Sequence, residues 1–170
     1  MSYVEILVLR HLSARPAHGY ELRKRVEATA GYLLHNNSLY PALRRFEEAG
    51  AVTKTEQSQQ GRPAKYVYEL TGTGREMLHE MLAELPPEDA DDDVEFFTRL
   101  GQFGLLEPAE RQAVLAARGR ALRTRIEHLG TMRDLSRDDR WASRSVAELL
   151  RRAEQELDWL AELGQQAELP

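Results

Sequence analysis

An aromatic ring and two guanidinium groups share one face of a short helix that the sequence predicts within residues 36–50. Tyr40, Arg44 and Arg45 lie within about one and a half helical turns of one another. The opposite face is apolar and is expected to be buried; it consists of Leu39, Leu43 and Phe46. A guanidinium group can fork onto a guanine edge, and a tyrosine hydroxyl can bond phosphate. This face suits nucleic-acid binding, and on periodicity alone it also suits an ordinary solvated helix surface.

Residues with strong positional preferences mark the ends of this helix. Asn36, Asn37 and Ser38 can each cap a helix start, and Gly50 suits the left-handed residue that follows a helix end. Pro41 has no backbone N–H to donate, so we expect it in the first turn. The helix is therefore predicted to begin near Asn37 or Ser38.

Two further helices are predicted before this one. Residues 4–12 form a strongly apolar segment, which indicates a buried helix. Residues 20–30 carry Leu22 and Val26 at helical spacing, and a basic cluster occupies the exposed side. The short segment 31–35 then leads into the third helix. The separation of the second and third helices is typical of a helix-turn-helix pair.

The pattern changes from helix to strand after Gly50. Residues 51–56 and 65–70 have the composition and alternation of strands, and the polar segment 57–64 lies between them. This pattern predicts a β-hairpin directly after a recognition-type helix, which is the wing of a winged helix-turn-helix. Arg62 near the hairpin tip is placed to reach a minor groove or phosphates.

A further helix and a domain boundary follow the hairpin. Thr73 and Glu76 have the spacing of a capping box, and apolar positions continue this helix to Leu85. Two prolines and the acidic run 88–93 come next, and we interpret the run as a solvated linker whose aspartates would also suit the start of the next helix. The predicted organisation is a winged helix-turn-helix domain over residues 1–85, a linker over 86–93 and an α-helical dimerisation domain over 94–170.

The second half is helical in pattern throughout. Helices are predicted over residues 94–106, from Pro108 to about residue 135, and over about 144–164. Their apolar stripes exceed what these helices can bury among themselves, so we expect a homodimer. Aromatic side chains are expected in the dimer core, where they could also line a pocket for a small hydrophobic or aromatic effector; they are Phe96, Phe103 and Trp159.

Composition excludes several classes of function. The 170 residues include no cysteine, which excludes disulfides, thiolate catalysis and Cys-ligated zinc. Neither a membrane span nor a signal peptide is predicted, so a cytoplasmic location is expected. The five histidines are scattered and no catalytic motif is present, so we predict no metal, no cofactor and no enzymatic activity. Tyr66 and Tyr68 are expected on the core side of their strand.

The net charge of -5 is unevenly distributed along the chain. Residues 1–85 carry 11 Lys and Arg against 10 Asp and Glu, whereas residues 86–170 carry 12 against 18. The acidity therefore belongs to the second half, and a local basic surface in the first half is compatible with DNA binding. The net acidity also permits an alternative, in which a winged helix has lost DNA binding and serves as a protein-interaction module.

Five short motifs together resemble the PadR family of bacterial transcriptional regulators. In chain order they are His18-Gly-Tyr-Glu-Leu22, Ser38-Leu-Tyr-Pro-Ala-Leu-Arg-Arg45, Glu47-Glu-Ala-Gly50, Gly61-Arg-Pro-Ala-Lys-Tyr66 and Tyr68-Glu-Leu-Thr71. Their order and spacing match the family over residues 4–85. Residues 94–165 more loosely resemble the long helical carboxy-terminal domain of one branch, including the aromatic Trp159 in the last helix.

The resemblance implies a mainly α fold with a small β-hairpin wing, a helical dimerisation domain, and repression of a promoter until an effector releases the protein. The residues that it implies as DNA contacts are Tyr20, Ser38, Tyr40, Pro41, Arg44, Arg62, Pro63 and Lys65. Arg44 suits a guanine edge, while Lys65 and the hydroxyl of Tyr40 suit phosphate. Where family members commonly have Ser-Pro-Gly or similar before the recognition helix, this chain has His35-Asn-Asn37, and Asn37 could bond adenine in a bidentate pair.

Overall fold

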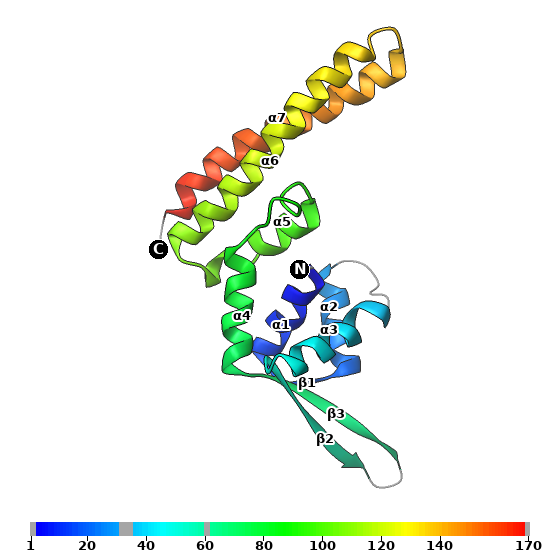
Figure 1. The fold of residues 1–170 in the computed structure, drawn as a ribbon, viewed down its shortest axis with the longest axis vertical. Coiled ribbons are helices and arrows are strands. Elements are labelled where there is room, and N and C mark those ends of the chain that lie inside the picture. The colour runs from blue at the N-terminus through cyan, green and yellow to red at the C-terminus, as the bar shows by residue number, and fades with distance from the viewer. Residues whose placement is uncertain (1–2, 31–35, 60–61, 169–170) are drawn as a thin grey trace. The chain divides into compact units, whose positions relative to one another are not determined.

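A computed structural model describes residues 3–30, 36–59 and 62–168 of the chain, and the side chains of residues 30, 36–38, 58, 59 and 62–64 lie outside the description. The chain forms two compact units, Met1–Leu82 and Ala83–Pro170 (Figure 1). Each is mainly helical, and the first also contains a small antiparallel sheet, so the predicted fold class is confirmed. Among the described residues, no helix is long and apolar enough to cross a membrane.

Three helices enclose the core of the first unit. They are α1 (Tyr3–Ala14), α2 (Gly19–Ala30) and α3 (Asn36–Glu48), and α1 contacts both of the others. The apolar stripes predicted from helical spacing are buried in this core, where α1 contributes Ile6 and Leu9, α2 contributes Leu22 and Val26, and α3 contributes Leu39, Leu43 and Phe46. Burying one face of each helix leaves the other face of α3 to solvent.

The start of α3 differs from the prediction. The helix begins at Asn36, so Pro41 is its sixth residue and does not lie in the first turn. Proline fixes φ near the helical value, and only the carbonyl four residues earlier loses a donor, so the ring is tolerated near the helix start. The predicted left-handed residue after the helix is confirmed, because Gly50 has a φ of 72°.

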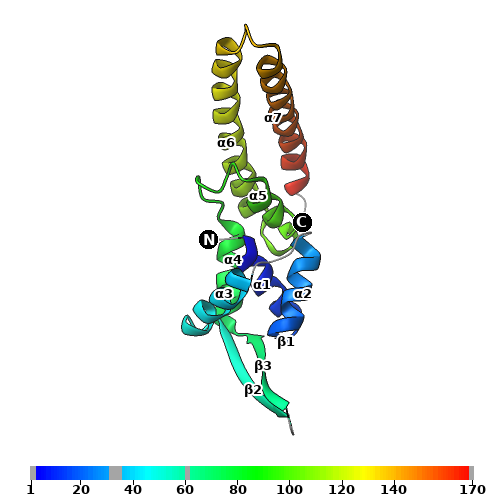
Figure 2. The ribbon, with the colours of Figure 1, turned by 90° about the vertical axis from the view of Figure 1, so that its right-hand side faces the viewer.

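A three-stranded antiparallel sheet forms the wing and its base. The strands β1 (Ala17–His18), β2 (Val52–Gln59) and β3 (Arg62–Leu70) have the order β1-β3-β2. β2 and β3 form the predicted hairpin, which extends away from the helices of its unit (Figure 2). Both strands reach further toward the tip than predicted, because backbone pairing continues through polar residues that carry no apolar alternation. The two-residue β1 was not predicted, since so short a strand has no measurable period.

The junction between the sheet and α4 (Gly72–Ala83) is capped by Thr71. Its hydroxyl accepts from the backbone N–H of Gly74 at 3.1 Å and donates to the carbonyl of Gly50 at 2.7 Å. The predicted cap at Thr73 was wrong, because Thr73 already lies inside the helix. A Cβ on Gly74 would meet the carbonyl oxygen of Ala51 at 2.1 Å, so the start of α4 and the backbone just before β2 approach closely there.

Two long helices dominate the second unit. α6 (Pro108–Leu135) and α7 (Arg140–Ala167) lie side by side along their length, and α5 (Asp93–Leu100) and a 3-10 turn at Phe103–Leu105 pack against the same core as both of them (Figures 1 and 2). The predicted helix over residues 94–106 is therefore divided at Gly101, which follows the last residue of α5. α7 is longer than predicted because Asp139 caps it by accepting from two backbone N–H groups.

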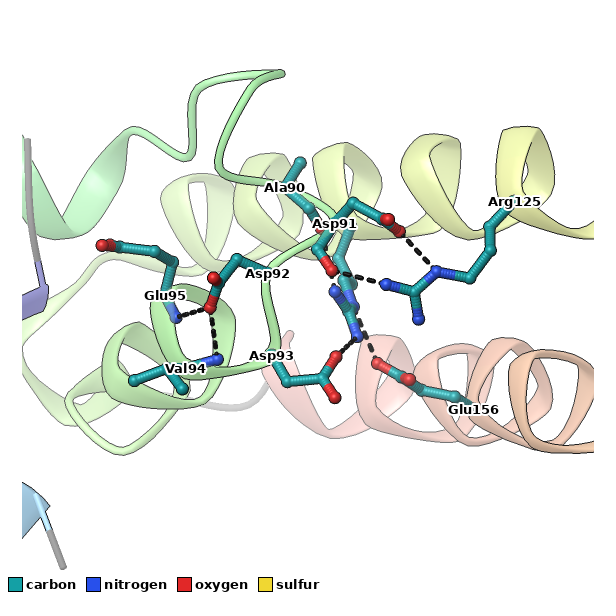
Figure 3. A network of polar contacts seen from close by, with 9 residues as sticks. Ala90, Asp91, Asp92, Asp93, Val94, Glu95, Arg125 and Glu156 are labelled. Atoms are coloured by element: carbon teal, nitrogen blue, oxygen red, sulfur yellow. Dashed lines mark hydrogen bonds and ion pairs between the residues drawn. The ribbon is translucent and has the colours of Figure 1, made fainter. Parts of the chain in front are cut away.

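A buried arginine joins three segments of this unit. Arg118 of α6 is completely buried and donates to Glu156 at 2.7 Å, to the carbonyl of Ala90 at 3.0 Å and to Asp93 at 2.5 Å. Figure 3 shows Asp93 and Glu156 approaching the same point from different segments. Burial acts to lower the pKa of Arg118, but the hydrogen bonds to Glu156 and Asp93 outweigh it and raise the pKa overall.

The acidic run 88–93 lies against α6. Besides the contacts of Arg118, the guanidinium of Arg125 pairs with the carboxylate of Asp91 at 2.8 Å (Figure 3). Asp92 caps α5 by accepting from the backbone N–H of Val94 at 2.7 Å, as the alternative interpretation of the run proposed. Asp91, Asp92 and Asp93 therefore have specific partners within the second unit.

Candidate nucleic-acid interface

The outer face of α3 carries three of the predicted contact residues. Tyr40, Pro41 and Arg44 are all exposed, directly opposite the buried face of the helix. Arg44 is 81% exposed at its side chain and donates to Glu48 one turn later at 2.9 Å. This hydrogen bond raises the pKa of Arg44 further above its ordinary value, so the guanidinium is always charged. An exposed pair of this kind contributes little to stability, so it leaves the arginine available to a ligand.

Arg45 has a different role from its neighbour. Its guanidinium pairs with Glu5 of α1, which is buried and lies 40 positions away in the chain. Arg45 lies on the solvent face with Arg44, as predicted, and its side chain is 58% exposed. Helical spacing alone does not show its partner in another helix. Arg45 therefore joins α3 to the core, and Arg44 is the arginine of this face that has only an exposed partner on its own helix.

The wing contributes cations and a second aromatic. Lys65 is exposed on β3, and the ammonium of Lys54 on β2 lies 4.2 Å from the centre of the Tyr66 ring. The prediction that Tyr66 faces the core was wrong, because it is 42% exposed, whereas Tyr68 is 8% exposed as predicted. Both tyrosines alternate onto the same strand face, but Tyr66 lies further along β3 toward the hairpin tip. Lys54 and Tyr66 were missed because their contact depends on strand register.

Tyr20 lies in the first turn of α2 and is 67% exposed. The ammonium of Lys24, one turn later, lies 4.8 Å from the centre of its ring. Such a cation–aromatic pair places a positive charge beside a hydroxyl group at the surface. Tyr20 thus has the exposure that a contact residue needs.

A pocket of about 430 Å³ opens between α2, α3 and β3. We name it the tyrosine pocket; its lining residues are His18, Gly19, Tyr20, Glu21, Tyr40, Lys65, Tyr66 and Tyr68. A Cβ on Gly19 would lie 3.1 Å from Cε1 of Tyr40, so the absence of a side chain at residue 19 lets this ring approach α2. The pocket therefore brings together Tyr20, Tyr40 and Lys65, which come from three separate motifs of the sequence.

An adjoining hollow of about 540 Å³ lies on the other side of Tyr40 and Tyr68. It is lined by these two tyrosines together with Arg44, Glu47, Glu48 and Lys54. Burial raises the pKa of Tyr68, with smaller contributions from Glu47, Tyr40 and Tyr66, so its hydroxyl keeps its proton at ordinary pH. The two hollows share a wall of tyrosine side chains.

Four predicted contact residues have side chains outside the described part of the structure. Asn37 and Ser38 belong to the first turn of α3, and Arg62 and Pro63 begin β3. Gly61 of the predicted tip and His35 before the helix lie outside the described residues altogether.

The three aromatics considered for an effector belong to one apolar core or pack against it, and Phe103 is the one of the three that lines the adjoining pocket. Phe96 is completely buried in the core of the second unit, under the guanidinium of Arg118 at 5.2 Å. Trp159 contacts the ring of Phe97 at a centroid distance of 6.0 Å. Phe103 lines a pocket of about 400 Å³ with Leu100, Gly104, Arg111, Leu163, Gln166 and Ala167.

Comparison with known proteins finds a family match in the first unit. Residues 8–80 match the model of the transcriptional regulator PadR-like family. The chain is also 38% identical over 74 residues to a 37.1 kDa protein of a Streptomyces fradiae transposon, a match that covers 44% of this chain and 20% of that protein. The chain thus spans about a fifth of this relative's length.

The solved structures found by the comparison include proteins described as transcriptional regulators. Bacillus subtilis PadR, solved in complex with operator DNA, is 19% identical, with a TM-score of 0.46 over 98% of each chain. A protein from Thermoplasma acidophilum is 32% identical, with a TM-score of 0.42 over 45% of this chain and 72% of its own.

Proposed function

Residues 8–80 of this chain belong to the PadR-like family of transcriptional regulators, and from this premise we propose that the protein binds an operator as a homodimer and represses transcription until an effector releases it. The winged helix-turn-helix of the first unit is the DNA-binding part, and the family is one of regulators, not of enzymes. The family match indicates a DNA-binding regulator. We propose in addition an operator, repression, a homodimer and an effector.

One observation supports operator binding above the others. α3 buries one apolar face and leaves Tyr40, Pro41 and Arg44 on the other, beside the hairpin. A helix of this kind can enter a major groove while the hairpin follows the adjacent backbone. An Arg44 with only an exposed partner has no other evident function in the fold.

The contacts divide between sequence recognition and backbone binding. We assign Arg44 to a guanine edge and Asn37 to adenine, because both lie on α3 and can form bidentate pairs. We assign the other predicted residues to the backbone or to a minor groove; they are Tyr20, Ser38, Tyr40, Pro41, Arg62, Pro63 and Lys65. The contacts to bases would then determine sequence specificity, and the contacts to the DNA backbone would increase affinity for every sequence.

The homodimer is proposed from the second unit. The end of α6 and the start of α7 share a small apolar core, which consists of Leu129, Val146 and Leu150 with Ile126 packed against it. Large apolar side chains remain exposed on these helices, among them Leu135, Trp141 and Leu149. A second copy would cover such side chains. Two recognition helices about 34–36 Å apart would then face an inverted repeat.

An apolar effector is proposed for the pocket beside Phe103. Leu100 and Leu163 supply apolar walls there, and Arg111 supplies a cation while donating to the carbonyl of Phe103 at 2.9 Å. Trp159 and the buried Phe96 belong to the surrounding core, so they would shape the pocket indirectly. A panel of small hydrophobic and aromatic compounds should contain members that raise the melting temperature of the wild-type chain and not of Phe103→Ala.

Selection of genome fragments with the purified chain, at near-physiological salt, tests the proposal. We expect enrichment of an inverted repeat, whose affinity falls steeply with salt by about one unit of log slope per neutralised phosphate. Failure to enrich any DNA, or binding that ignores salt, would favour the protein-interaction alternative. Genes next to the enriched site would indicate which pathway to screen for an effector.

A further inference from the structure

The two kinds of basic side chain are distributed differently along the chain. Only three of the 23 basic residues are lysine, namely Lys24, Lys54 and Lys65, and all three belong to the first unit. The 12 basic residues of segment 86–170 are all arginine. We propose that the three lysines are acylation sites, at which transfer of an acyl group to the side-chain amine weakens DNA binding. The inference rests on the proposed function, since it concerns the surface assigned to DNA.

The three lysines lie on the elements that are assigned to DNA binding. Lys24 lies on α2, Lys54 on β2 and Lys65 on β3, and all three are exposed. Lys65 lines the tyrosine pocket, and Lys54 lines the adjoining hollow together with Arg44. The sequence has no other lysine. A reagent that attacks side-chain amines therefore modifies only this surface.

The contacts of the three ammonium groups leave them accessible. None of them forms an ion pair with a carboxylate of the described residues. Instead, Lys24 lies 4.8 Å from the centre of the Tyr20 ring, and Lys54 lies 4.2 Å from that of Tyr66. Contacts of this kind are weak at exposed sites, so the amine can leave the ring. A lysine amine on a flexible exposed side chain is the usual target of acylation.

Arginine forms the ion pairs that join the helices of each unit. Arg45 joins α3 to α1 through Glu5, and Arg118 bonds Glu156 in the core of the second unit. A guanidinium group stays protonated in proteins, so it does not attack an acyl donor. Acylation would therefore remove charge from the surface assigned to DNA and would leave these ion pairs intact.

The reaction requires an activated acyl group, which an acyl phosphate or an acyl thioester supplies. The neutral form of the lysine amine attacks the carbonyl carbon, and a C–N bond forms. The C–O bond to phosphate, or the C–S bond to the thiol, breaks, and the leaving group takes the bonding electron pair. The amine proton passes to water. The product is an uncharged amide, which no longer attracts phosphate or forms the cation–aromatic contact.

Loss of these charges should appear in the salt dependence of DNA binding. Each lysine that contacts a phosphate contributes about 0.9 to the slope of log affinity against log salt, or about eightfold in affinity per tenfold change in salt. Lys65 is a predicted contact, and Lys54 lies in the hollow beside Arg44. Loss of two such contacts should lower the slope by about 1.8 and the affinity in 0.1 M salt by about 60-fold.

The test uses the full-length chain, the DNA fragment that it selects, and acetyl phosphate as the acyl donor. Peptide mass spectrometry identifies the acetylated lysines, and DNA affinity is titrated at several salt concentrations before and after treatment. We expect acetylation of the three lysines, together with a fall in both the affinity and the salt slope. A parallel arm with acetyl-coenzyme A shows whether thioesters react as acyl phosphates do, and reaction with either donor supports the inference.

The matched control is a triple variant that combines Lys24→Arg, Lys54→Arg and Lys65→Arg. It keeps the three positive charges and the terminal amine of the chain, but it removes the side-chain amines. Its untreated affinity is its own reference, and acetyl phosphate should not change that affinity. An equal loss of affinity in the wild type and in the triple variant would assign the effect to another group and overturn the inference.

Protection by DNA provides a measurement that needs no variant, should the triple variant fail to bind. The wild-type chain is treated with acetyl phosphate in the presence and absence of the DNA fragment. Bound DNA should slow acetylation of Lys54 and Lys65, while the terminal amine provides the reference rate. Equal rates with and without DNA would show that these amines do not face DNA, which would overturn the inference.

The remaining outcomes separate this inference from the proposed function. If neither donor acetylates the three lysines, or if acetylation leaves the affinity and the salt slope unchanged, the inference is overturned while the proposed function stands. If the untreated wild-type chain binds no DNA, the proposed function fails and the inference with it.

Discussion

Arg44 and Arg45 are adjacent in the chain, yet they contact different partners. Arg44 bonds only the exposed Glu48 on its own helix, whereas Arg45 bonds the buried Glu5 on another helix. The same type of side chain therefore has only an exposed partner on its own helix at one position and joins two helices at the next. At the residue scale, this difference gives a matched pair of substitutions.

Arg44→Ala is expected to relax sequence preference. Loss of a bidentate contact to guanine should remove about 1–3 kcal/mol of discrimination at one base pair of each half-site. Competition binding with a set of single-base operator variants measures this. Arg62→Ala, by contrast, should weaken binding to every variant similarly, because the wing tip is assigned to the backbone or minor groove.

Arg45→Ala is the control for Arg44→Ala. It should lower the unfolding midpoint of the first unit, since Glu5 would remain buried without this guanidinium. The bound sequence should be unchanged. An Arg44→Ala variant that keeps the full sequence preference would contradict the assignment of the α3 face, and a change in preference with Arg45→Ala would contradict the division between the two arginines.

At the scale of elements, the start of α4 lies close to the backbone of Ala51, just before β2. Gly74→Ala should destabilise this unit by about 1–3 kcal/mol, because the added methyl would overlap the carbonyl of Ala51. Gly72→Ala is the matched control on the same helix, since a Cβ there meets nothing within 4 Å. Thermal unfolding of both variants distinguishes them. Equal midpoints of the two variants would show that the backbone at Ala51 can move away from the added methyl group without loss of stability.

Arg118 holds the elements of the second unit together through a buried guanidinium. Arg118→Met should destabilise this unit by about 2 kcal/mol, below the roughly 3–5 kcal/mol of a fully buried pair. The reduction is expected because Asp93 is 63% exposed and can regain water, while Glu156 is only 19% exposed. Denaturant unfolding measures it. Arg137→Ala, which removes an exposed pair with Asp134, should leave the midpoint unchanged.

At the scale of the whole molecule, an exposed apolar face on the long helices is the observation that a dimer would explain. Leu149→Glu should raise the dimer dissociation constant about tenfold or more, because burial of one leucine accounts for a change of this size. Sedimentation equilibrium measures it, with Gln165→Glu as the control that adds the same charge to α7. A Leu149→Glu variant that dimerises like the wild type would move the interface elsewhere.

Patterns within a few residues determined much of this protein. The helical spacing of Leu39, Leu43 and Phe46 predicted the buried face of α3, and Gly50 predicted its end. The change of period after residue 50 predicted the hairpin, and the short motifs predicted the family. These features depend on the backbone and on neighbouring side chains, so sequence spacing is sufficient to find them.

Only the tertiary structure decided which partner each polar side chain has. Arg45 finds Glu5, and Arg118 finds Glu156, across separations that no local period records. Packing of the sheet against the helices left Tyr66 exposed and buried Tyr68, although both lie on the same face of β3. The physical reason is that hydrogen bonds and burial depend on distances in space, and these are fixed only when separate elements pack together.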